Sequence, residues 1–398
     1  MKKVFIIILL MSLFFGNVYS QKKIISQAKT YIKSGKDLDK AEKLMSDLLK
    51  DTANTKETKI WLTLFEAVKK QYEQGNEKLY LKQKYDTTAL FVAGRKMFSI
   101  LESLDSVEMM PDKDGHVKIK YRDKHAEYLD MIRPNLFNGG VFFTQKHDYA
   151  KAFDFYEAYI DCVHQPLFTD YHYENDELLP RAAYGTMYAG YKLEKPELTL
   201  KYADLAQKDT ENIDYVRQYI AETYRMQRDT TRYVEVLLRG FAHNPRFPYF
   251  FPRLIDYYSS TDQLDSAMII VDKALATDST NQVYRFAKST VLLNLGKYDE
   301  SIAICDSLIN ENDSLADVYY NLGLAYFNQA IEMDIIKQRT RSVQRKIEAL
   351  YKKSLPYMEK YRQLSPEEQD KWMPVLYTIY LNLNMGKEFD GIEKIRKK

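Results

Sequence analysis

The sequence has only two cysteines, Cys162 and Cys305, in 398 residues. This number excludes the cysteine-dense disulfide scaffolds that hold small secreted domains together. The two lie 143 residues apart in the chain. We therefore expect two buried thiols, with a single disulfide as the alternative.

Sequence patterns of enzymes are also missing. The chain contains no H-E-x-x-H, G-x-S-x-G, C-x-x-C, Walker loop or G-x-G-x-x-G. The six histidines are scattered from His116 to His243, and the spacing of His164 and His172 matches no standard metal-ligand pattern. We predict a protein that is not an enzyme and that uses no catalytic residue, metal or cofactor. The enzyme alternative would place a pocket with perturbed carboxyl groups in the polar stretch 161–180.

No excess of either charge is present, because 58 Lys and Arg face 56 Asp and Glu. A protein that binds nucleic acid needs a strongly basic face to neutralise the phosphates. A balanced surface therefore predicts no nucleic-acid partner.

Long apolar runs are missing except at the beginning of the chain. Lys2 and Lys3 precede an apolar run over 4–15, and small residues occupy the cleavage-determining positions Val18 and Ser20. The run has 12 residues, whereas about 20 are needed to span a bilayer. We expect a cleaved signal peptide over 1–20 and a mature chain from Gln21 with no integral membrane span. Because no cysteine follows the signal, we expect a periplasmic or secreted protein that is not a lipoprotein.

The sequence does contain a repeat of 34 residues. Four residues between 317 and 327 have the spacing W-x₂-L-G-x₂-Y, with tyrosine in place of tryptophan: Tyr319, Leu322, Gly323 and Tyr326. Chemically equivalent residues recur at steps of 34 in three columns of a second helix: Thr199, Tyr233, Ala267 and Ser301; Ala203, Leu237, Val271 and Cys305; Ala206, Gly240, Ala274 and Leu308.

This pattern resembles the tetratricopeptide repeat family over about residues 24–385, most strongly over 133–326. The resemblance implies an all-α fold, a right-handed superhelical solenoid of antiparallel helix pairs. We expect N-terminal helical repeats with irregular insertions over 21–132, an array over 133–366 and capping helices over 367–398. In the weaker N-terminal part, a stretch over 72–85 separates a helix around Trp61 from one over 87–104. Gly140 occupies the small position at which two helices of a pair cross.

One repeat carries an insertion. After Tyr326 the pattern resumes 19 residues late, at Ser354, Met358 and Tyr361, and the added residues fall within 328–353. They contain no Gly or Pro and many helix formers, so we expect both helices to be extended into a hairpin. Its tip carries a basic cluster that is either a solvated surface or a docking surface for an anionic partner: Lys337, Arg339, Arg341, Arg345 and Lys346.

The family resemblance also implies where a partner would bind. In that family, extended peptides or partner helices lie along a concave face formed by the first helix of each repeat. No repeat here has the Lys and Asn pair that clamps a terminal carboxylate, and the groove is expected to be apolar and aromatic with acidic points at Glu222 and Asp256. Each inward position could equally be a packing residue: Phe137, Val141, Gln218, Glu222, Pro252, Asp256, Phe286, Thr290, Tyr320 and Leu324.

The expected function is therefore that of an exported, non-enzymatic scaffold that binds a protein or peptide in the bacterial cell envelope. The alternative is a module that binds a glycan or a surface assembly. In that case exposed members of the 33 tyrosines and 2 tryptophans would stack on sugar rings, flanked by Asp or Asn.

Overall fold

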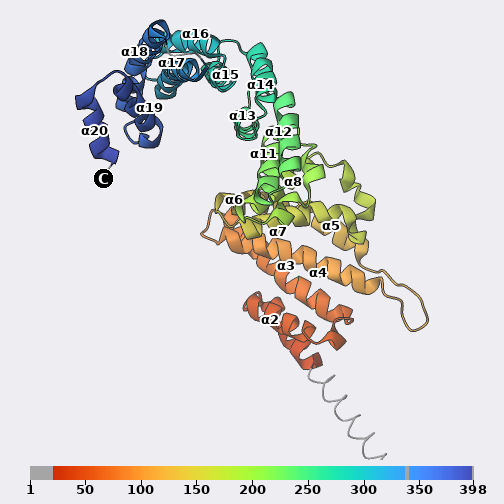
Figure 1. Ribbon diagram of the computed structural model, residues 1–398. Coiled ribbons are helices and arrows are strands. Elements are labelled where there is room, and N and C mark those ends of the chain that lie inside the picture. The colour runs from red at the N-terminus through yellow and green to blue at the C-terminus, as the bar shows by residue number, and fades with distance from the viewer. Residues whose placement is uncertain (1–20, 337–339, 397–398) are drawn as a thin grey trace, which may run out of the picture. The chain divides into compact units, whose positions relative to one another are not determined.

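The computed structural model describes residues 21–336 and 340–396. Within them all regular structure is helical (Figure 1), which confirms the predicted all-α class. The predicted signal peptide, Lys337 and Arg339 lie outside the described residues. The chain forms two compact units, one ending at Asp229 and the other beginning at Thr230. No described helix is both long and apolar enough to cross a bilayer.

The first unit begins with a helix over 21–34. Its later helices and 3₁₀ turns are α2 (Leu38–Leu49), η1 (Thr52–Asn54), α3 (Thr58–Tyr80), α4 (Thr87–Glu108), α5 (Arg122–Ile132), α6 (Pro134–Gln145), α7 (Tyr149–Asp161), η2 (Cys162–His164), η3 (Pro166–Tyr171), η4 (Tyr173–Asn175), α8 (Leu179–Lys192), α9 (Pro196–Leu200), α10 (Ala203–Ala206) and α11 (Ile213–Met226). Successive helices pack on one another, as in the pairs α3 with α4, α6 with α7 and α7 with α8.

The stretch 72–85 is mostly not a separate insertion. Helix α3 continues through it to Tyr80, and only 81–86 connect it to α4. Gly75 explains the close return, because a Cβ at this position would lie 2.4 Å from the ring of Tyr85. The connection therefore folds back directly onto the helix that it leaves.

The second unit consists of α12 (Thr230–His243), α13 (Phe250–Ser260), α14 (Leu264–Thr277), α15 (Gln282–Asn294), α16 (Tyr298–Glu311), α17 (Ala316–Ile336), α18 (Arg341–Leu364), α19 (Gln369–Asn382) and α20 (Gly386–Arg396). Helices α12, α14 and α16 begin at residues 230, 264 and 298, which is the 34-residue step of the sequence. Each of the first helices α13, α15 and α17 packs on the second helices beside it. The predicted helix pairs at a step of 34 residues are therefore confirmed in this unit.

The predicted columns form the core of these pairs. Burial is complete or nearly so for Leu237, Ala267, Val271, Ala274, Ser301, Cys305 and Leu308. Cys305 and Cys162 are both buried and free, in agreement with the prediction of two buried thiols. After the insertion, Ser354, Met358 and Tyr361 are buried in the same way, so the sequence pattern located the resumed register correctly.

The insertion lengthens a helix pair. Helices α17 and α18 have 21 and 24 residues, whereas α15 and α16 have 13 and 14. The two long helices pack against each other, and the Sδ atom of Met358 lies so near Gly323 that a Cβ there would be 2.3 Å away. Gly323 of the repeat motif thus allows the two extended helices to pack closely.

His125 on α5 gives the first unit a pH-dependent stability. It is 7% exposed, with the ring centroids of Phe65 and Tyr121 at 5.4 and 5.6 Å. Burial, reinforced by the positive charge of Lys124 and opposed by Asp105, lowers the pKa of His125 to about 4. The unfolded chain, with an ordinary histidine pKa of 6.5, therefore binds a proton that the folded chain does not, and stability falls as the pH falls through this range.

We expect this residue to account for a loss of about 2 kcal/mol in the free energy of unfolding between about pH 7.5 and about pH 5. The change His125→Phe keeps the ring packing and removes the titration. Urea unfolding followed by circular dichroism at both pH values should show a smaller pH dependence in this variant by that amount. An unchanged dependence would contradict the assignment.

Candidate functional site

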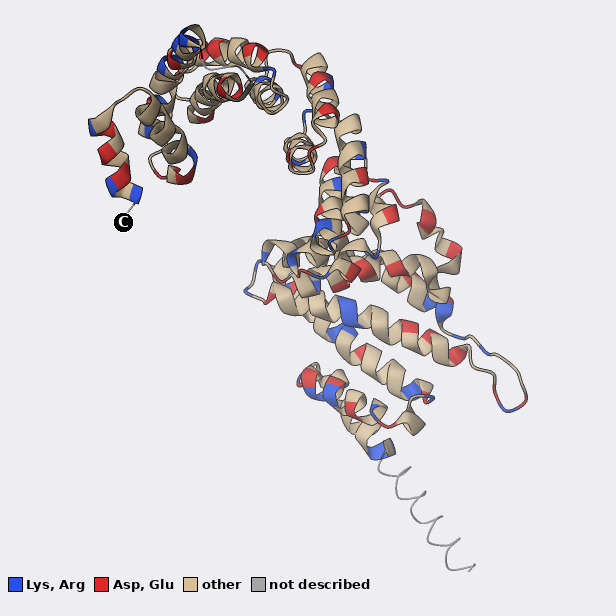
Figure 2. Cartoon of the chain, viewed as in Figure 1, with Lys and Arg blue, Asp and Glu red and all other residues tan. Residues whose placement is uncertain are grey.

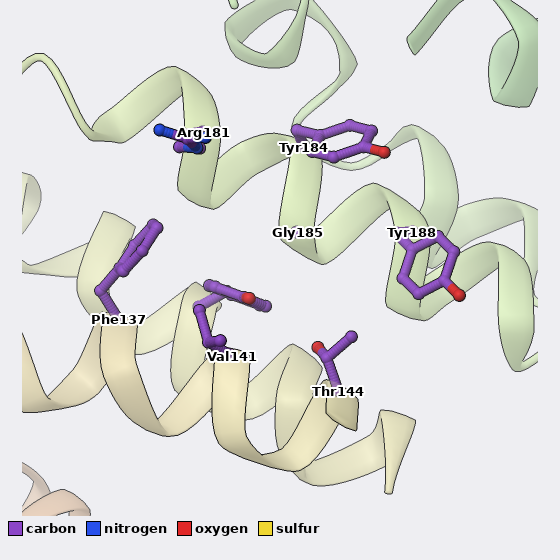
Figure 3. A pocket seen from close by; sticks show the side chains of 8 residues that line it. Phe137, Val141, Thr144, Arg181, Tyr184, Gly185 and Tyr188 are labelled. Carbon is purple, nitrogen blue, oxygen red and sulfur yellow. The ribbon is translucent and has the colours of Figure 1, made fainter. Parts of the chain in front are cut away.

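A pocket of about 510 Å³ opens between α6 and α8 in the first unit. One wall is formed by α6 and the other by α8, with side chains from both directed into the space between them (Figure 3). Such a volume is typical of sites that hold a small ligand or a few side chains of a peptide. The lining residues are Phe137, Val141, Thr144, Tyr156, Arg181, Tyr184, Gly185 and Tyr188.

Two glycines make room for the ring of Tyr156, which lines this pocket. The ring of Tyr156, from α7, lies between them: a Cβ at Gly140 on α6 or at Gly185 on α8 would each come within 2.6 Å of it. The edge of Phe137 also meets this ring, with centroids 5.6 Å apart. Because any larger residue at either glycine would collide with the ring, the pair of glycines determines how deeply Tyr156 is seated.

The α8 wall is held by tyrosine packing. The rings of Tyr184 and Tyr188 lie 6.2 and 5.8 Å from that of Tyr219 on α11. Burial raises the pKa of Tyr156, Tyr184 and Tyr188, so their hydroxyl groups are protonated at neutral pH. The site thus offers aromatic surface and neutral hydroxyl groups on preordered side chains.

Among the described residues, Arg181 is the one charged side chain that lines the pocket. Its Nη2 atom lies 3.4 Å from the Glu211 carboxylate, and the two side chains are 54% and 73% exposed. A pair this exposed contributes little energy and is readily exchanged. The guanidinium group can therefore meet an acidic group of a ligand at the edge of an otherwise apolar site.

Sequence reasoning placed Phe137 and Val141 in a binding groove, and the structure places both in this pocket. The other two groove candidates of the first unit lie on α11 and do not line it. Glu222 is 6% exposed, with its carboxylate 2.7 Å from Arg225, and Gln218 is half-buried. The acidic point expected at Glu222 is thus a paired, buried group.

In the second unit the groove candidates contribute mainly to helix packing. Phe286 and Leu324 contact the core around α16 and α17, and the ring of Tyr320 lies 4.8 Å from that of Tyr361. Thr290 accepts a hydrogen bond of 2.8 Å from the buried amide of Asn321. On α13, Asp256 and Pro252 are exposed. Most groove candidates of the second unit therefore pack between helices, which is the alternative that the sequence analysis left open.

The basic cluster of the insertion is exposed as far as it is described. Arg341, Arg345 and Lys346 follow the helix cap at Thr340 and point to solvent. Figure 2 shows basic and acidic residues interspersed on the helices of each unit. His164 at the end of η2 and His172 between η3 and η4 are also exposed.

The remaining pocket residues were missed because the register of the sequence breaks between α7 and α8. The connection from 162 to 178 adds residues, so that Tyr184 and Tyr188 fall out of step with Phe137 and Val141. A signal was nevertheless present. Both pairs have the i, i+4 spacing that places two side chains on one helix face, and Arg181 precedes the second pair by one turn.

No family model and no curated protein matches this chain. Solved structures of helical repeat proteins do. They include a MamA RS-1 double mutant at 16% identity and a TM-score of 0.36, which covers 46% of this chain and 94% of that one. YrrB, a TPR protein with an unusual peptide-binding site, has 14% identity, a TM-score of 0.28 and coverages of 65% and 97%. A TPR repeats protein from Bacteroides fragilis has 16% identity, a TM-score of 0.29 and coverages of 63% and 98%. These likenesses concern the fold and carry no information on a ligand.

Proposed function

We propose that the protein is a non-enzymatic scaffold that binds an extended protein or peptide segment in the pocket between α6 and α8. The observation that supports this is the preordered aromatic site itself, with Tyr156 seated between Gly140 and Gly185. Rigid aromatic side chains bind a partner with little loss of conformational entropy. The segment would place bulky apolar side chains against Phe137 and Tyr184 and an acidic group near Arg181.

The proposed setting is the cell envelope, after export and cleavage of the signal peptide. This part of the proposal rests on the pattern of residues 1–20. Mass spectrometry of the protein purified from its own cells should find an N-terminus at Gln21, and fractionation should recover it with periplasmic or secreted proteins. A chain that retains Met1 in the cytoplasm would refute the export proposal without affecting the pocket.

The pocket is tested by filling it. Peptides selected from a random library on the protein should be rich in bulky apolar residues. The change Val141→Trp should weaken their binding at least about tenfold, which corresponds to about 1.4 kcal/mol. The matched control Val283→Trp, at a 58% exposed position on α15, should leave the affinity within about twofold, a difference of less than 0.5 kcal/mol or so. Equal effects of the two changes would show that the selected peptides bind elsewhere.

A second candidate, glycan binding, is favoured by a tyrosine cluster in the second unit. The rings of Tyr326 and Tyr357 are 10° from parallel with centroids 6.0 Å apart, and Tyr319 lies 6.4 Å from Tyr357. Burial, reinforced by the negative charge of Asp306, raises the pKa of both Tyr326 and Tyr357, so a carboxylate lies near these half-buried rings. If this is the site, Tyr357→Ala should abolish retention on envelope polysaccharide, whereas Val141→Trp should not.

A further inference from the structure

Helix α19 in the second unit is apolar on two opposite faces. Its buried face packs into the core of the unit with Trp372, Val375, Leu376, Ile379 and Tyr380. The outer face, at the helical spacing i, i+3, i+4, i+7, i+8 and i+11, is exposed or half-buried and consists of Asp370, Met373, Pro374, Tyr377, Thr378 and Leu381. A surface helix ordinarily has a polar outer face, and a helix that is apolar on both sides is ordinarily covered on both. The outer face of α19 is therefore expected to meet a partner.

This outer face is also hollowed. A pocket of about 340 Å³ lies over it, and Arg396 from the end of α20 completes its wall. The guanidinium carbon of Arg396 lies 5.5 Å from the centroid of the Tyr377 ring, and the same ring packs on Phe389 of α20 with centroids 4.7 Å apart. Arg396 is thereby held beside residue 377. Leu381, which continues the apolar stripe beyond the pocket, is 56% exposed.

Two opposite charges flank the apolar centre of this face. Asp370 lies at the beginning of the stripe and Arg396 lies beside Tyr377, and both charged residues are exposed. Within residues 21–336 and 340–396 neither belongs to an ion pair. Residues 370 and 377 are about 10 Å apart along the helix axis. A matching surface must therefore present a cation opposite Asp370 and an anion opposite Arg396 at that separation.

A second copy of the same face meets both requirements. When two α19 helices lie antiparallel with a two-fold axis between residues 373 and 374, residue 370 of one copy is opposite residue 377 of the other. Asp370 then meets Arg396 of the second copy, and the symmetry repeats this pair on the other side of the axis. A parallel alignment in register would place like charges together, which is unfavourable.

The uncharged residues of the face agree with the antiparallel alignment. It places Met373 opposite Pro374, so that apolar surface meets apolar surface at the axis. It also places Gln369 opposite Thr378. The Thr378 hydroxyl donates to the carbonyl of Pro374 (3.0 Å), which leaves its oxygen able to accept from the Gln369 amide of the second copy. The same surface thus supplies both halves of each contact.

We propose that the protein forms a two-fold dimer through the outer faces of α19 and the Arg396 side chains. The contact is small, with one helix face and one helix end from each copy, so its dissociation constant is expected on the order of 10 µM. The proposal does not depend on the pocket between α6 and α8, which belongs to the first unit and shares no residue with this face.

Sedimentation equilibrium of the full mature chain from Gln21 measures the association over about 1–200 µM. Asp370→Arg puts a second cation opposite Arg396, and Arg396→Asp puts a second anion opposite Asp370. Each change should raise the dissociation constant at least about thirtyfold. Lys273→Asp, at an exposed position on α14, is the matched control and should alter it less than about threefold. All three positions are exposed, so none of the changes affects the core.

A mixture of the two interface variants tests the two-fold symmetry. In a mixed dimer of the Asp370→Arg and Arg396→Asp chains, every introduced charge meets its opposite. The equimolar mixture should therefore associate within about threefold as tightly as the parent protein, although neither variant does so alone.

Photocrosslinking in the protein's own cells identifies what covers the face. A photoreactive residue in place of Leu381 should crosslink to a second copy near Pro366, which the antiparallel alignment places opposite it. The proposal is overturned if the parent protein stays monomeric at about 200 µM, if Lys273→Asp weakens association as much as the interface changes do, or if the mixed variants remain monomeric. It is also overturned if position 381 crosslinks only to another protein.

Discussion

Replacing Gly140 by tryptophan is expected to prevent the α6–α8 region from folding. An added Cβ alone would lie 2.6 Å from the ring of Tyr156, and real Cβ contacts are never this short. The ring has little room to move away, because a Cβ at Gly185 on α8 would lie equally close to its opposite edge, so that only the absence of a side chain there accommodates the ring. Overpacking usually costs about 1–3 kcal/mol, and an indole at a site that lacks room for a methyl group should exceed that. Loss of the folded signal in circular dichroism and calorimetry is the expected result.

The smaller change Gly140→Ala gives the expected loss of stability a magnitude. Alanine is favoured over glycine in a helix by about 1 kcal/mol, so Gly140→Ala would stabilise the protein if only helix propensity mattered. We expect a net destabilisation of about 1–3 kcal/mol, since the contact with Tyr156 dominates. The control is Gly391→Ala on α20, where an added Cβ meets nothing within 4 Å. This change should raise the free energy of unfolding. If the Gly140→Trp protein unfolded at the same urea concentration as the parent protein, the position of the Tyr156 ring between Gly140 and Gly185 would be refuted.

The sequence predicts most of this fold because the repeat constrains the same helix faces many times. Ala267 and Ser301 are buried where the small column expects them, and the late match at Ser354 located the resumed register across an insertion. The physical reason is that each helix pair must bury the same face against its neighbours. Where the repeat is irregular, the prediction weakens, as in the stretch 72–85, where helix α3 continues to Tyr80.

The candidate site is predicted less completely. Phe137 and Val141 could be placed on an inner face from their helix alone, but the opposite wall depends on how the connection between α7 and α8 folds. That connection has no periodicity. It is fixed by long-range contacts, among them the hydrogen bond of 2.6 Å from Tyr173 to Asp130. Such contacts cannot be predicted from any local pattern in the sequence.

Arg133 is the centre of these contacts. Its side chain is 7% exposed, and its guanidinium carbon lies 3.8 Å from the ring centroid of Tyr159 and 3.9 Å from that of Tyr173. Its Nη1 atom is 2.6 Å from the Asp176 carboxylate, which also accepts a hydrogen bond of 2.5 Å from the Tyr159 hydroxyl. Burial acts to raise the pKa of Asp176, but the hydrogen bonds from Tyr159 and Arg133 outweigh it and hold that pKa below its ordinary value. The carboxylate is therefore ionised, and its stabilising effect is lost only as the pH falls through this lowered pKa.

Replacing Arg133 by methionine should lower the free energy of unfolding by about 3–5 kcal/mol, because it leaves the Asp176 carboxylate without its cation in a largely buried place. Loss of the cation stacked between two tyrosine rings adds to this. The surface pair of Arg239 and Glu235, with side chains 68% and 53% exposed, provides the control, and Arg239→Met should change stability by no more than about 0.5 kcal/mol. The double change Arg133→Met with Asp176→Asn should recover part of the loss, since no unpaired charge remains. If Arg133→Met and Arg239→Met gave equal urea midpoints, the connection would be held by its apolar residues rather than by this cation.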